Sequence, residues 1–81
     1  MWYYRPFKVI TEYFDKGKVK TTTHWEVREY YPKSDVIDEM WTESAIEPIG
    51  DTRKGLIKTL EMMLEDVKHY KPKVERRKLK Q

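Results

Sequence analysis

Residues 19 to 31 alternate between two kinds of side chain, and this pattern constrains the fold more than any other feature. The odd positions are mostly apolar or β-branched: Val19, Thr21, Thr23, Trp25, Val27 and Tyr31. The even positions are mostly polar: Lys20, Thr22, His24, Glu26, Arg28 and Tyr30. Because successive side chains of a strand point to opposite faces, the pattern predicts a strand with its odd positions buried and its even positions in water.

The preceding segment, residues 2 to 14, predicts a second strand beside the first. It is rich in aromatic and β-branched residues, which favour strands. Between the two segments, Asp15-Lys16-Gly17-Lys18 supplies the aspartate and glycine that a tight hairpin turn requires. Pro6 has no backbone N–H, so we expect this strand to lie at a sheet edge or to begin after Pro6. A further turn at residues 32 to 35 and a third, shorter strand from Met40 to Ile46 follow.

Residues 51 to 70 carry the signals of a helix. Asp51 or Thr52 can accept a hydrogen bond from a free backbone amide of the first turn. Apolar residues then recur at intervals of three and four, which predicts one apolar stripe on a helix that ends near Tyr70, before Pro72. The stripe comprises Leu56, Leu60, Met63, Leu64 and Val67. We expect it to pack on the sheet, with Gly55 allowing a close approach to the strands.

These elements predict an α+β fold. The arrangement is a three-stranded antiparallel meander with one C-terminal helix packed on one face, in the order β-β-β-α. A chain of 81 residues has room for one hydrophobic core, so we expect a single domain at residues 1–72. Residues 73–81 are interpreted as a basic flexible tail whose removal leaves folding nearly intact.

Charge is distributed unevenly along the chain. The formal net charge is +3, but residues 71–81 hold six basic side chains and one acidic one. Residues 1–70 therefore carry eleven basic and thirteen acidic side chains, which makes the body mildly acidic. Six acids and no base lie between Lys33 and Arg53, so this stretch has a negative potential.

Several classes of function lack support in the sequence. The chain has no cysteine, which excludes disulfides, thiol catalysis and cysteine-ligated metals. His24 and Glu26 share the polar face, but no third group completes a catalytic set. The acids Asp35, Asp38 and Glu39 lack the spacing of a calcium loop. We therefore expect no enzyme, no metal and no cofactor. No apolar run is long enough to span a membrane and no signal peptide follows Met1, so a cytoplasmic location is expected.

Two hypotheses of function remain. Aromatic residues fall on both faces of a sheet whose one helix can cover only one face, which favours an interaction module that binds another protein or itself. The candidate interface residues are Tyr3, Tyr13, Tyr30 and Trp41. Uncovered tyrosines and unpaired edge strands predict a two-fold homodimer. The simpler interpretation is that the aromatics only extend a thin core.

The alternative is a nucleic-acid accessory protein that uses its C-terminal segment. Cations in this segment would neutralise phosphates and give salt-sensitive binding. The candidate contacts are Lys73, Arg76, Arg77, Lys78 and Lys80. The acidic body opposes wrapping by a duplex, and no aromatics alternate with these cations to stack on bases.

Five short motifs also resemble a set of small uncharacterised bacterial proteins. In chain order they are WYYR from Trp2, EVREYY from Glu26, WTE from Trp41, PIGDT from Pro48 and LEMML from Leu60. The resemblance covers roughly residues 2 to 74 and implies no activity, so no functional residue is assigned from it. The C-terminal segment is basic here, whereas the similar proteins look acidic there.

Overall fold

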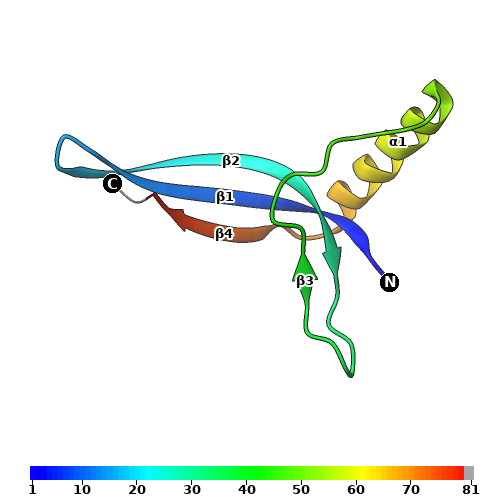
Figure 1. The fold of residues 1–81 in the computed structure, drawn as a ribbon, viewed down its shortest axis with the longest axis horizontal. Coiled ribbons are helices and arrows are strands. Elements are labelled where there is room, and N and C mark those ends of the chain that lie inside the picture. The colour runs from blue at the N-terminus through cyan, green and yellow to red at the C-terminus, as the bar shows by residue number, and fades with distance from the viewer. Residues whose placement is uncertain (80–81) are drawn as a thin grey trace.

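The computed structural model describes residues 1–79 of the chain, which form an α+β fold (Figure 1). The elements are β1 (Tyr3–Asp15), β2 (Lys18–Tyr31), β3 (Met40–Trp41), α1 (Arg53–His69) and β4 (Lys73–Lys78). The strands make one sheet in the order β3-β2-β1-β4. The predicted class is therefore confirmed, but the predicted count of three strands is wrong.

The hairpin of β1 and β2 forms the long central part of the sheet. Its antiparallel register pairs Tyr3 with Tyr30 at one end and Asp15 with Lys18 at the other. The turn uses Lys16 and Gly17, whose φ angles of 52° and 78° lie in the left-handed region. This conformation matches the twist of the flanking strands and confirms the predicted turn.

The fourth strand corrects the prediction of a flexible segment at residues 73–78. β4 pairs in parallel with β1, from Phe7 opposite Lys73 to Glu12 opposite Lys78. Its side chains also find partners, because Glu75 and Lys73 each take part in an ion pair with the body. Parallel strands require a crossover connection, and α1 provides it.

Pro6 lies inside β1, which is a central strand rather than an edge strand. The pairing with β4 begins only at Phe7, so Pro6 lies beyond the start of that ladder. The missing N–H of Pro6 would point toward β4, because the backbone groups of the even residues of β1 point that way, as the bond from Leu79 to Glu12 shows. The backbone groups of its neighbours Arg5 and Phe7 point toward β2. The proline therefore removes no hydrogen bond from the sheet, which explains why β1 tolerates it.

The third strand is shorter than the predicted Met40 to Ile46. Only Met40 and Trp41 pair regularly with β2. The chain stays attached afterwards, because the N–H groups of Thr42 and Ile46 donate to the carbonyls of Glu29 and Val27. The loop between these two bonds bulges over the sheet.

Helix α1 begins and ends close to where the sequence predicts. The Thr52 hydroxyl accepts a hydrogen bond from the N–H of Gly55 at 3.0 Å, and the helix ends at His69. Gly55 lies near Gly50 rather than near the sheet. A Cβ atom on Gly50 would come within 2.3 Å of the backbone N of Leu56, so the close approach joins the loop to the helix start.

The helix does not lie across the sheet, which corrects the predicted packing. It projects beyond the sheet end and is attached near Tyr4, whose N–H donates to Asp66 at 3.0 Å (Figure 1). Only Met63 of the helix is buried. Leu60 is 46% exposed and Leu64 is 53% exposed, so much of the predicted stripe is in water. Because α1 contacts the sheet only near the start of β1, the contact is too small to bury all five residues of the apolar stripe.

In its second half, β2 reverses the predicted faces, because Arg28 and Tyr30, at even positions, are the buried residues. In its first half, every residue from Lys18 to Trp25 is exposed, at even and odd positions alike. Register places the even residues of β2 beside Phe7 and Val9, which are fully buried. The "closed face" carries the odd residues of β1 from Tyr3 to Tyr13, the even residues of β2 from Lys20 to Tyr30, and Trp41, Lys73, Glu75 and Arg77. The opposite side is the "open face".

Candidate protein-binding face

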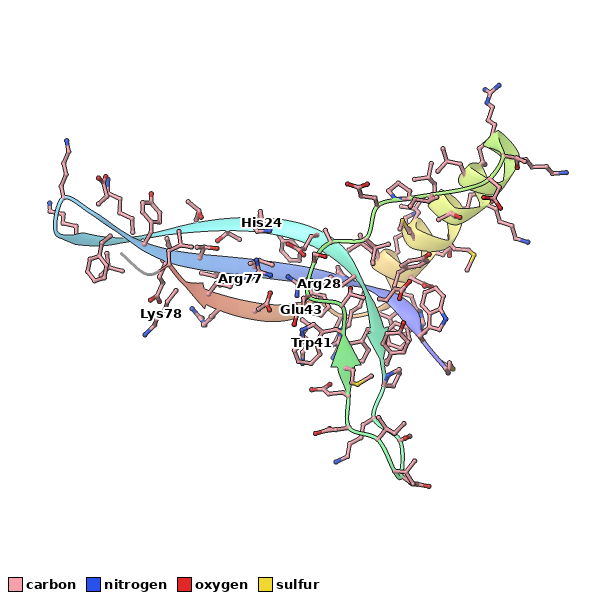
Figure 2. All side chains as sticks on the ribbon, viewed as in Figure 1. His24, Arg28, Trp41, Glu43, Arg77 and Lys78 are labelled. Carbon is pink, nitrogen blue, oxygen red and sulfur yellow. The ribbon has the colours of Figure 1, made fainter. Side chains whose placement is uncertain are left out.

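The closed face is built around the guanidinium of Arg28, which is 0% exposed. Its Nε donates to Glu26 Oε2 at 2.6 Å, and its Nη2 donates to Glu75 Oε2 at 2.7 Å. The carbonyl of Thr42 accepts from Nη1 at 3.4 Å, and the ring of Phe7 lies 4.7 Å from the guanidinium carbon. Arg28 therefore connects β2 to β4 and to the loop after β3. The next residue of this loop, Glu43, accepts a hydrogen bond through its carbonyl from Arg77 Nη2 of β4 at 3.3 Å, and Figure 2 labels these residues.

The ionisation of this cluster is shifted toward the charged forms. Desolvation would raise the pKa of Glu26, but hydrogen bonds from Arg28 and His24 outweigh it and hold the pKa below its usual value. A hydrogen bond from Arg28 likewise lowers the pKa of Glu75. Desolvation lowers the pKa of Arg28, yet its bonds to Glu75 and Glu26 raise it overall. The cluster is fully paired, which is the arrangement of a structural ion network.

Three of the four predicted interface residues meet on the closed face. The rings of Tyr3 and Tyr30 lie 5.4 Å apart, and those of Tyr30 and Trp41 lie 6.4 Å apart. Tyr30 is only 6% exposed, and its hydroxyl donates to Glu39. This hydrogen bond raises the pKa of Tyr30. Tyr13 lies far from the other three, toward the hairpin turn. These aromatics therefore pack mainly against one another, and their interface role stays a prediction.

Strand alternation divides the predicted nucleic-acid contacts between the two faces. On the closed face, Lys73 bonds Glu39 at 3.2 Å, and Arg77 pairs with Glu75 at 3.0 Å. Arg76 and Lys78 belong to the open face, and neither has a carboxylate within 4.0 Å in the described part of the chain. Lys78 points away from the sheet at the end of β4 (Figure 2). Lys80 lies outside the described residues.

His24 and Glu26, considered from the sequence as an acid–base pair, both belong to the closed face. His24 Nε2 lies 2.6 Å from Glu26 Oε1. The other carboxylate oxygen of Glu26 is bonded to Arg28, so this group is already held by a permanent cation. Within residues 1–79, no three potential metal-ligating side chains cluster together.

The open face presents apolar side chains from three adjacent strands. Register places Trp25, Lys8 and Val74 in one row across β2, β1 and β4, with the Lys8 ammonium 5.9 Å from the Trp25 ring centre. Trp25 is 58% exposed. Along the stretch from Lys8 to Phe14 of β1, the apolar members of this face are Ile10, Phe14, Val19, Trp25 and Val74, and the charged members are Lys8, Glu12, Arg76 and Lys78. Glu29 belongs to the same face nearer the helix, opposite Tyr4. At the hairpin end, Phe14 and Val19 border a hollow of about 250 Å³.

Sequence reasoning missed the open face because it treated apolar character as burial. The odd positions of β2 are the more apolar set, yet those from Val19 to Trp25 are exposed, since α1 lies beyond the opposite end of the sheet. One signal was present in the sequence. Glu26 and Arg28 stand two apart, so they share a face of the strand and form a charge pair that permits burial.

Comparisons with known proteins supply no further constraint. The chain matches no protein-family model, no curated protein and no solved structure. Within residues 1–79, the one helix is too short and too polar to cross a membrane.

Proposed function

We propose that this protein is a small non-enzymatic module that binds another protein through its open face. The main observation is that Trp25 on β2 and Val74 on β4 are exposed apolar side chains on either side of Lys8, in one row across three strands. Tryptophan provides a large contact area at low entropic cost and is enriched at the centres of interfaces. The row lies where β1 is paired with a strand on each side, so little backbone ordering is required when a partner binds.

The charges of the open face define the kind of partner. Lys8 lies between Trp25 and Val74, Arg76 and Lys78 follow Val74 along β4, and Glu12 and Glu29 are the acids of this face. Two copies placed open face to open face would bring these cations together, which costs free energy in a desolvated contact. The face therefore fits a partner with an apolar centre and an acidic rim better than it fits itself.

Replacing Val74 by aspartate is expected to weaken partner binding by about tenfold or more, since a charge then lies in the apolar row. Val36→Asp is the control, because Val36 is the same residue type, is 89% exposed against 52% for Val74, and lies in a loop outside this face. The measurement is affinity capture from a nuclease-treated lysate, followed by titration of the purified partner. Equal capture by both variants would contradict the proposal.

A second candidate, nucleic-acid binding, has one specific observation in its favour. The Lys8 ammonium lies 5.9 Å from the Trp25 ring centre, and Arg76 and Lys78 belong to the same face. An aromatic ring on a face with cations suits a single strand. Binding of this kind must weaken steeply with salt. A partner that is lost on nuclease treatment, together with salt-dependent binding of a single-stranded oligonucleotide that Arg76→Ala and Lys78→Ala reduce, would favour this candidate.

A further inference from the structure

The outer edge of β2 has unpaired backbone groups over half its length. The carbonyls of Val27 and Glu29 accept hydrogen bonds from the chain after β3, so the odd residues of β2 direct their backbone groups outward. By the same alternation, the backbone N–H and C=O groups of Val19, Thr21, Thr23 and Trp25 also point outward, away from β1. Among residues 1–79, no strand pairs with this stretch, because β3 contacts only the far end of β2.

This free edge is suited to pairing with a copy of itself. It runs from Lys18 to Glu26 and is centred on Thr22. Its central three residues are uncharged threonines, which form favourable cross-strand pairs. Exposed edges are normally protected by charged side chains, and the centre of this edge has none.

We propose that two copies pair antiparallel through the β2 edges, with Thr22 on the two-fold axis. This inference concerns a different surface and a different partner from the proposed function. The symmetry then places Thr21 opposite Thr23 of the second copy and Val19 opposite Trp25 of the second copy. It also places Lys18 opposite Glu26 of the second copy, so opposite charges meet at both ends. The two sheets become one continuous sheet.

The other free edge, β4, is unsuited to the same pairing. The N–H of Leu79 donates to Glu12, so Val74, Arg76 and Lys78 direct their backbone groups outward. An axis at residue 76 places Arg76 opposite its own copy, and an axis at residue 75 places Glu75 opposite its own copy and Lys73 opposite Arg77. Like charges directly opposite each other destabilise a sheet. The cations of β4 thus disfavour pairing of that edge with a second copy, whereas the uncharged threonines of β2 permit it.

Two proline substitutions at matched positions test this dimer. Thr23→Pro and Arg76→Pro each remove one outward N–H that the hairpin and the β1–β4 ladder do not use, the first at the β2 edge and the second at the β4 edge. Light scattering on a size-exclusion peak of the purified wild-type protein is expected to give twice the 10.0 kDa chain mass. Thr23→Pro is expected to give one chain mass, and Arg76→Pro to keep the dimer.

A charge-swap experiment avoids any effect of proline on folding. Thr21→Lys with Thr23→Lys, and Thr21→Glu with Thr23→Glu, should each yield monomers because like charges then face each other. Mixing the two variants should restore a mass of two chains. A wild-type monomer at about 100 μM, well above the micromolar range of specific association, or a dimer that survives Thr23→Pro but not Arg76→Pro would overturn the proposal. Purified protein alone is used, so failure here leaves the capture result on Val74→Asp unaffected.

Discussion

Replacing Arg28 by methionine is expected to lower the free energy of unfolding by about 3 to 5 kcal/mol, the cost of leaving buried charges without their partner. Arg28 is fully buried and holds both Glu26 and Glu75. Equilibrium urea unfolding followed by tryptophan fluorescence measures the change. Arg53→Met is the control, since this exposed arginine at the helix start has no ion-pair partner in the described part of the chain. Equal losses in both variants would contradict the structural role of Arg28.

The same cluster predicts how stability depends on pH. The pKa values of Glu26 and Glu75 lie below 4.5 in the folded protein. Their contribution to stability is therefore complete above the unfolded pKa and is lost as the pH falls through the lower folded values. Thermal unfolding from pH 7 downward should show this loss in the wild type. A smaller loss is expected in Arg28→Met, because its carboxylates no longer have a cation that favours their charged form.

Truncation after Pro72 is expected to cost at least about 3 kcal/mol, which lowers the melting temperature by more than about 10 °C in a domain of this size. Removal of β4 takes away the Glu75 partner of Arg28 and the strand that pairs with β1. This expectation reverses the one based on a flexible C-terminal segment. Differential scanning calorimetry of the truncated and full-length chains measures it.

Two point variants separate the reasons for that loss. Glu75→Gln removes the charge that pairs with Arg28 and should account for a substantial part of the destabilisation. Lys78→Ala changes an exposed residue with no carboxylate partner among residues 1–79 and should alter stability by less than about 0.5 kcal/mol. A truncated chain that melts like the full-length protein would show that β4 is dispensable.

Local signals in the sequence were sufficient for the α+β class, the hairpin turn and the helix bounds. The turn depends on Gly17 and the helix start on Thr52, and each acts on residues close to it in the chain. β4 could not be found in this way, because its partner β1 lies more than sixty residues away. Parallel pairing after a crossover leaves no short-range pattern, and a basic segment is easily taken for a solvated one.

The orientation of the sheet and of the helix was predicted wrongly for a related reason. Alternation in β2 shows that two faces differ, but which face is covered depends on where the remaining elements lie. Arg28 is charged yet buried because Glu26 and Glu75 neutralise it. Leu60 is apolar yet half exposed because α1 extends past the sheet end.

The predicted interface of Tyr3, Tyr13, Tyr30 and Trp41 stays a prediction, and our proposal rests on other residues. Tyr30 and Trp41 belong to the closed face, whereas Trp25 is an exposed aromatic residue of the open one. Which side chains are available to a partner depends on which face is covered, and the alternation in β2 does not contain that information.

Site-specific photo-cross-linking tests most directly whether the open face binds a protein. A benzophenone side chain is placed either at Val74 on the open face or at Val36 in the loop outside it, and each protein is irradiated with the purified partner. Strong cross-linking from position 74 and little from position 36 is the result we predict. Equal cross-linking from both positions, or cross-linking from position 36 alone, would contradict the assignment of function to the open face.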